Sequence, residues 1–175
     1  METVILVATG ALLSGLLSVA AYVWRQGDIE LVVDESSVRD AWARITGNQM
    51  TVGCVVDVRN RGRQDAFLLD VFCQPLYPGP VLEQLEILCQ VRQALPEPRR
   101  DWYWQAMILG KRRSCSLEIR VKINCRTSPK LLLTKLSELV LVIHLKAVGR
   151  RQIEYSLGEV LLDLVRLSSS SQKAG

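Results

Sequence analysis

The chain has 175 residues, a net charge of +4 and an ordinary charged fraction of 23%. When an apolar N-terminal segment and a polar tail are set aside, roughly 140 residues remain, which is the size of one domain with a sizeable core. The net charge is too small to indicate a nucleic-acid-binding protein. We therefore expect one folded domain and no nucleic-acid partner.

An apolar segment over Val4–Trp24 follows a short tail of residues 1–3 and contains no charged side chain. As a helix it would span roughly 31 Å, close to the hydrocarbon thickness of a bilayer. It predicts a transmembrane helix; a cleaved signal peptide and a buried core helix are the alternatives. Because Arg25 follows the segment and no Lys or Arg precedes it, the positive-inside rule predicts a single-pass protein with its N-terminus outside and its C-terminal domain on the cytoplasmic or stromal side.

Small residues recur every four positions within this segment, at Gly10, Ser14 and Ser18. Small residues at this spacing allow a second helix to approach closely. These three residues are therefore the predicted helix-packing site. The alternative is the ordinary composition of a membrane helix, in which Gly and Ser are common.

Charge is distributed unevenly along the rest of the chain. Asp28–Val91 carries ten acidic residues against five basic ones, whereas Arg92–Arg151 carries fourteen basic against four acidic. Such polarity can bind an acidic partner or an anionic membrane surface, although solvated turns would give the same pattern. Since Trp and Arg dominate binding hot spots, the predicted surface combines both types. It consists of Arg99, Arg100, Trp102, Trp104, Lys111, Arg112, Arg113, Arg150 and Arg151.

The first half of the domain predicts three strands and one helix. Asp28–Asp34 alternates as a strand does, and Glu35–Gly47 has helical spacing. Met50–Arg59 and Ala66–Gln74 predict two more strands, which the turn signal Asn60–Gly62 would join as a hairpin. In the last of these strands the side chains expected to face the core are Phe67, Leu69, Val71 and Cys73.

The second half predicts mostly strands, and Cys115–Cys125 is the clearest, because apolar and polar residues alternate without interruption. The alternation over Leu85–Val91 favours a strand, with a helix as the alternative. Pro129–Ser137 is interpreted as a short helix or an apolar loop. The remaining segments are strands at Trp102–Leu109, Leu139–Ala147 and Gln152–Ser156, an apolar segment at Glu159–Leu167 and a disordered tail at Ser168–Gly175.

Seven or eight short strands with few helices predict a mainly β fold. We expect an Ig-like antiparallel β-sandwich over residues 28–167, preceded by one transmembrane helix over residues 4–24 and accompanied by one or two short helices. The disordered tail over residues 168–175 would follow the sandwich.

The run Val55–Ala66 contains a V-x-N-x-G turn followed by Ala and a second apolar strand. It resembles intracellular Ig-like sandwich modules. The anchor, the turn and the basic hairpin together resemble uncharacterised single-pass proteins of cyanobacterial and plastid membranes. That second resemblance covers most of the chain without a specific motif; it implies a thylakoid location and no activity.

The sequence lacks the residues of a catalytic or metal centre. Its five Cys include no CxxC pair, and all are expected on inward faces, where they serve as core thiols. His144 is the only His and is expected on an outward face, away from the Cys side chains. We therefore expect no enzyme activity, no metal and no cofactor.

Two functions remain as hypotheses. The first is a membrane-anchored, non-enzymatic interaction module that docks on, assembles or stabilises a larger membrane protein complex. The second is a domain that handles a lipid or another small apolar ligand at the membrane surface. In both cases the expected partners are the lipid bilayer and, for the first, a membrane protein complex.

Overall fold

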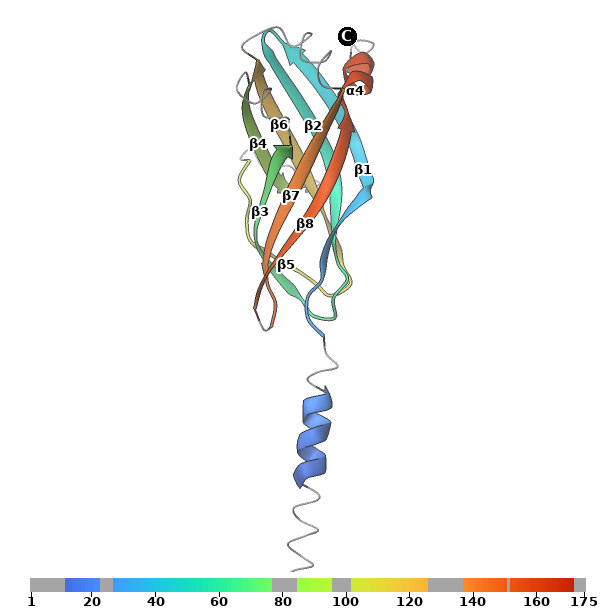
Figure 1. The fold of residues 1–175 in the computed structure, drawn as a ribbon, viewed down its shortest axis with the longest axis vertical. Helices are drawn as coiled ribbons and strands as arrows, with labels where there is room; N and C mark the ends of the chain where they lie inside the picture. Colours follow the sequence, from blue (N-terminus) through green and yellow to red (C-terminus); the bar gives the residue numbers. More distant parts are fainter. Residues whose placement is uncertain are drawn as a thin grey trace, which may run out of the picture.

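The computed structural model describes residues 12–22, 27–76, 85–95, 102–125, 137–150 and 152–171. Residues 12–22 form a helix that Figure 1 shows at one end of a long strand-built body. The other elements, in chain order, are β1 (Leu31–Thr46), β2 (Gln49–Asn60), β3 (Ala66–Leu76), β4 (Leu85–Gln93), β5 (Met107–Leu109), β6 (Ser114–Cys125), β7 (Glu138–Val148), β8 (Ile153–Asp163) and α4 (Leu164–Ser171).

The strands form two antiparallel sheets with four strands each. Sheet A has the order β1-β2-β6-β4, and sheet B has the order β5-β3-β7-β8. The inward side chains of both sheets make one core, in which Met50, Leu117 and Ile143 are fully buried. The predicted mainly β sandwich is therefore confirmed.

Strand β6 lies in the middle of sheet A and pairs with β2 on one side and β4 on the other. Its predicted alternation is confirmed, since every second side chain reaches the core and the others remain at the surface. The buried set is Cys115, Leu117, Ile119, Val121, Ile123 and Cys125. The strands predicted near β2, β4 and β7 are also confirmed.

The predicted helix over Glu35–Gly47 is wrong, because these residues continue the first strand, which pairs with β2 over most of its length. The register slips between Asp34 and Arg39 and again between Arg39 and Trp42, and Asp40 has a positive φ of 50°. Such bulges interrupt the two-residue alternation of a strand. The apolar spacing therefore imitates a helix in a strand that is irregular.

The predicted hairpin across Asn60–Gly62 is also wrong, because β2 belongs to sheet A and β3 to sheet B. The tight hairpin joins β1 and β2 instead, where Thr46 pairs with Gln49 and Gly47 has a φ of 57°. A left-handed residue of this kind is typical of two-residue hairpin turns. The sequence thus predicts the turn after β2 but not the sheet that the next strand joins.

Strand β3 departs from its predicted facing in its first half. Val71 and Cys73 are buried as expected, whereas Phe67 is exposed and Leu69 is only half-buried. The cause is a register slip against β7 within Leu68–Asp70, which shifts the alternation by one residue.

Two further boundaries differ from the prediction. Of Trp102–Leu109, only the last three residues form a strand, β5. At the C-terminal end, the strand expected over Gln152–Ser156 extends to Asp163 as β8. The helix α4 then includes Ser168–Ser171, which the sequence places in a disordered tail. The segment Pro129–Ser137 lies outside the described residues, apart from Ser137.

The N-terminal helix is described over residues 12–22 only. Within the described ranges, no helix is both long and apolar enough to cross a membrane. Residues 4–11 and 23–24 of the predicted span lie outside the described residues. Gly10 of the predicted helix-packing site is among them.

Candidate functional site

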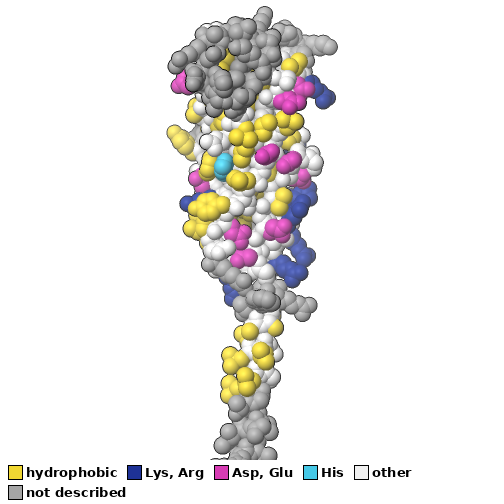
Figure 2. All heavy atoms as spheres, viewed as in Figure 1, with side chains coloured by type: hydrophobic (Ala, Val, Ile, Leu, Met, Phe, Trp, Pro, Cys, Tyr) yellow, Lys and Arg dark blue, Asp and Glu magenta, His cyan; other side chains and the backbone are white. Residues whose placement is uncertain are grey.

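The outward side of sheet B carries an unusually large set of exposed apolar side chains, which we call the apolar face. Strands β3 and β8 and the short β5 contribute to it through alternate residues, and β7 lies between β3 and β8. Figure 2 shows hydrophobic side chains around the single His on this side of the molecule. The apolar face consists of Phe67, Phe72, Leu76, Ile108, Ile153, Tyr155, Leu157 and Leu161, with exposed fractions between 43% and 72%.

Strand β8 explains how this surface arises. In its first half the apolar residues point outward, and Leu157 is 66% exposed. The residues that point inward are instead Glu154, Ser156 and Gly158, which are half-buried. Gly158 lies so close to Val33 of β1 that a Cβ atom would overlap that side chain. Small inward residues therefore let the edge of sheet A approach, and the apolar residues of β8 are left at the surface.

The centre of the apolar face is an aromatic pair. His144 of β7 stacks on Phe72 of β3, with ring centroids 4.3 Å apart and an interplanar angle of 8°. The predicted outward position of His144 is therefore confirmed. Next to this pair, Asp70 lies opposite Lys146 in the register of β3 and β7. The Lys146 Nζ atom lies 5.8 Å from the centroid of the Tyr155 ring. The face thus has an aromatic centre and a few charges of both signs.

The outward side of sheet A is polar by comparison. Arg39 forms an ion pair with Asp57 at 3.0 Å, and Arg92 forms one with Glu118 at 2.6 Å. Most of the exposed apolar side chains of the two sheets therefore lie on sheet B.

The predicted Trp residues lie beside β4 and β6. The Trp102 ring centroid is 3.9 Å from the Cζ atom of Arg92 and 3.8 Å from that of Arg120. Burial lowers the pKa of the Arg120 guanidinium, and the positive charge of Arg92 adds to this while Glu118 opposes it. Trp104 packs against the core. Trp102 therefore contacts two arginine side chains, whereas Trp104 is partly buried against the core.

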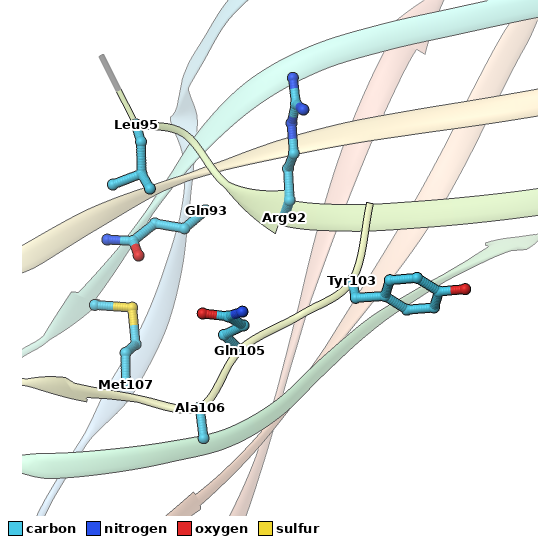
Figure 3. A pocket seen from close by; sticks show the side chains of 7 residues that line it. All are labelled: Arg92, Gln93, Leu95, Tyr103, Gln105, Ala106 and Met107. Carbon is cyan, nitrogen blue, oxygen red and sulfur yellow. The ribbon is translucent and has the colours of Figure 1, made fainter. Parts of the chain in front are cut away.

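A hollow of about 230 Å³ lies between β4 and the segment that leads into β5. Figure 3 shows Gln105 and Met107 on one side of it and Gln93 and Leu95 on the other, whereas Arg92 extends away. Its lining is mixed in polarity and brings no nucleophile and base together. Among the described residues, no group of three or more acidic, His or Cys side chains is placed to hold a metal ion.

The predicted basic residues Lys111, Arg112 and Arg113 lie in the turn before β6. Arg112 and Arg113 lie around a hollow of about 360 Å³. Arg59 and Arg61, which are not among the predicted site residues, line it with them. We call this the basic hollow; it is lined by Arg59, Asn60, Arg61, Arg112, Arg113 and Ser114. Arg150 lies in the exposed turn after β7, and Arg99, Arg100 and Arg151 lie outside the described residues.

Asn60 holds this end of the sandwich together. It is 1% exposed, the one buried polar residue in the described part of the chain. Its Nδ2 atom donates to the carbonyls of Gln64 at 2.7 Å and Leu109 at 3.2 Å. Its Oδ1 atom accepts from the backbone N–H of Gly62 at 3.0 Å and of Glu30 at 3.4 Å. One side chain therefore joins three segments that are distant in sequence.

Two of the three predicted helix-packing residues are described. Ser14 and Ser18 are both exposed on the helix over residues 12–22, and the Ser18 Oγ atom donates to the Ser14 carbonyl at 2.8 Å. This bond satisfies the Ser18 hydroxyl within its own helix.

The cysteines are core thiols, as predicted, except that Cys89 is only half-buried. Burial raises the pKa of Cys54 to about 11, and burial together with Asp57 raises that of Cys115 to about 11. A hydrogen bond between Cys73 and Cys89, the largest cause for both, raises the pKa of Cys73 and lowers that of Cys89.

These shifts predict an order of alkylation at pH 8. The thiolate is the reactive form, so Cys89 should react first with iodoacetamide. Cys54 and Cys115 should react only after unfolding, since a pKa near 11 leaves about one thiol in a thousand ionised at this pH. Mass spectrometry of briefly labelled native chain checks the order. Equal labelling of Cys54 and Cys89 would contradict it.

No protein-family model matches the chain, and no curated protein matches it. The solved structures similar to it include the yeast GGA1 GAE domain-P21, with 8% identity and a TM-score of 0.39 over 75% of this chain and 90% of that one. The GAE domain of GGA2p from Saccharomyces cerevisiae has 10% identity and a TM-score of 0.36 over 77% of this chain and 96% of that one. A protein from Archaeoglobus fulgidus has 11% identity and a TM-score of 0.33 over the same shares.

Proposed function

We propose that this chain is a membrane-anchored, non-enzymatic interaction module that docks on a larger membrane protein complex through its apolar face. The observation that carries the proposal is the exposed apolar side of sheet B, centred on Phe72, Tyr155 and Leu157. Contiguous apolar surface of this kind marks binding sites on soluble domains, because water makes its exposure unfavourable. The partner is a protein surface that is itself apolar.

A protein partner fits this face better than the hydrocarbon of a bilayer. Asp70, Lys146 and Glu159 project from the same side of sheet B as the apolar residues. Charged side chains are costly in hydrocarbon, whereas protein interfaces combine an apolar centre with charged residues near the rim.

The anchor in this proposal is the apolar segment Val4–Trp24, which would hold the domain on the cytoplasmic or stromal side with the N-terminus outside. The stripe of Gly10, Ser14 and Ser18 would then face a helix of the same complex. The finer parts of the proposal are an Ig-like classification of the sandwich and, from the resemblance above, a thylakoid location.

The test is a double substitution, Leu157→Lys with Leu161→Lys, on the apolar face. Both side chains are exposed, so the fold should survive while docking weakens by at least about 2 kcal/mol, as expected for interface anchors. On a native gel after mild detergent extraction, the wild-type chain should co-migrate with a large complex and the variant should not. The matched control, Ile45→Lys with Leu88→Lys, places the same charges on exposed residues of sheet A.

Two results would contradict the proposal. One is a variant that still co-migrates with the complex. The other is a wild-type chain that runs by itself and releases bound lipid on extraction, which is the behaviour expected of a lipid- or ligand-handling domain.

A further inference from the structure

The basic hollow lies where the N-terminal segment joins the sandwich. The backbone N–H of Arg61 donates to the Glu30 carbonyl at 2.7 Å, and that of Arg63 donates to the Asp28 carbonyl at 3.2 Å. The hollow is therefore formed beside the first residues of the domain. Trp24 is four residues before Asp28, and four residues span at most about 14 Å.

The wall of the hollow is fixed in place by backbone bonds. The N–H of Asn60 donates to the Arg113 carbonyl at 2.9 Å, and the N–H of Arg113 donates to the Gly110 carbonyl at 3.1 Å. Between them, Arg112 has a left-handed φ of 55°, a conformation that residues other than Gly rarely adopt. The turn thus holds two adjacent arginines at the rim in a defined geometry.

Most of the positive charge in the hollow is not neutralised. Arg59 forms an ion pair with Asp34 at 3.1 Å. By contrast, among the described residues no carboxylate lies within ion-pair distance of the exposed side chains of Arg61, Arg112 and Arg113. In Figure 2, Lys and Arg side chains gather on one flank of the domain near the helix.

Among the acidic residues at this end, Asp34 is held mainly by Ser36 and Arg59, although the charge of Arg61 also lowers its pKa. The Asp65 carboxylate accepts from the backbone N–H of Lys111 at 2.7 Å. Asp28 lies near Glu154, whose pKa is raised by burial and by the charge of Asp28. The three arginines are thus available to an external anion.

We infer that Arg61, Arg112 and Arg113 form a binding site for the phosphate groups of anionic lipid headgroups. Guanidinium groups match phosphate oxygens in geometry and charge. The inference deepens the proposed function and rests on its membrane anchor, because the anchor would bring this end of the sandwich to the headgroups. The site would hold the domain upright on the bilayer, with the apolar face directed sideways.

The test compares binding of the full chain to sucrose-loaded vesicles of phosphatidylcholine and of phosphatidylcholine with 30% phosphatidylglycerol, in low salt. The wild-type chain should bind the anionic vesicles more tightly. Each basic residue near an anionic surface contributes about five-fold in affinity. The variant Arg61→Gln with Arg112→Gln and Arg113→Gln should therefore lose roughly 100-fold of this added affinity. The charge-matched control is Arg44→Gln with Lys122→Gln and Arg166→Gln, away from the hollow.

The two vesicle types distinguish a failure of the membrane anchor from a failure of the arginine site. Binding to neutral vesicles reports the anchor, and its absence contradicts the membrane part of the proposed function. The difference in affinity between anionic and neutral vesicles measures the contribution of the three arginines. The inference is overturned if wild type shows no difference, if the arginine variant keeps it, or if the control variant loses it equally. It is also overturned if inorganic phosphate at constant ionic strength removes the difference, or if single-stranded RNA occupies the site more tightly than the vesicles.

Discussion

Asn60→Ala is expected to lower the free energy of unfolding by about 3–5 kcal/mol, the largest effect of any single substitution considered for this chain. The change removes the side chain that bonds Glu30, Gly62, Gln64 and Leu109, and leaves buried backbone groups without partners. Each such group costs about 1–3 kcal/mol when water does not replace the lost bond. Chemical denaturation of the wild-type and variant chains in the same detergent measures the difference.

Asn60→Asp sharpens this prediction because it preserves the shape. The carboxylate would face the Gln64 and Leu109 carbonyl oxygens, where a donor now lies. Burial and these oxygens should raise the pKa of the new carboxyl in the folded state above its unfolded value. The folded state would then bind the proton more tightly, so the variant should be less destabilised at pH 5 than at pH 8. A loss of stability that does not depend on pH would show that the hydrogen bonds donated by the Asn60 amide group matter less than the shape of the side chain.

Gly158→Ala is expected to cost about 3 kcal/mol, the second large effect. A Cβ atom at this position overlaps the Val33 side chain, where β8 at the edge of sheet B meets β1 at the edge of sheet A. The two sheets would have to separate to admit one methyl group. Denaturant unfolding measures the loss, and Ser156→Ala on the same side of β8 is the matched control.

A double-mutant cycle identifies the cause. Val33→Ala should remove part of the obstruction, so the double variant should be more stable than the sum of the two single losses predicts. Additive losses would mean that the damage from Gly158→Ala arises somewhere other than the Val33 contact.

How much of this fold is predictable depends on how regular each strand is. Cys115–Cys125 is regular and pairs on both sides, so its alternation alone identifies β6 and its buried face. Glu35–Gly47 is interrupted by two register slips, so its side-chain spacing gives the wrong element. The turn at Asn60–Gly62 is correctly predicted, but its role in joining two sheets depends on distant segments that no local pattern reports.

The apolar face escapes sequence-based prediction for a different physical reason. Sequence reasoning assigns alternating apolar residues to the core, yet in β8 Tyr155 and Leu157 point outward. The available signal was the other half of the alternation, Ser156 and Gly158, which suits a close approach by another strand better than a solvated surface. The basic turn Lys111–Arg113 was predicted, but its neighbours Arg59 and Arg61 come from a segment whose net charge is acidic.

The register slip in β3 makes one residue of this strand dispensable for the facing of its aromatic side chains. Phe67 and Phe72 are five positions apart, and in a regular strand an odd separation places two side chains on opposite faces. Both face outward here only because the slip within Leu68–Asp70 adds one residue between them. Deleting the one extra residue would leave Phe67 and Phe72 four positions apart, and in a regular strand this even separation also keeps both rings outward. Inserting one residue in a strand without the slip would instead direct one of the two rings into the core. Tolerance to a one-residue deletion at the slip is therefore the mutational signature of these two phenylalanines.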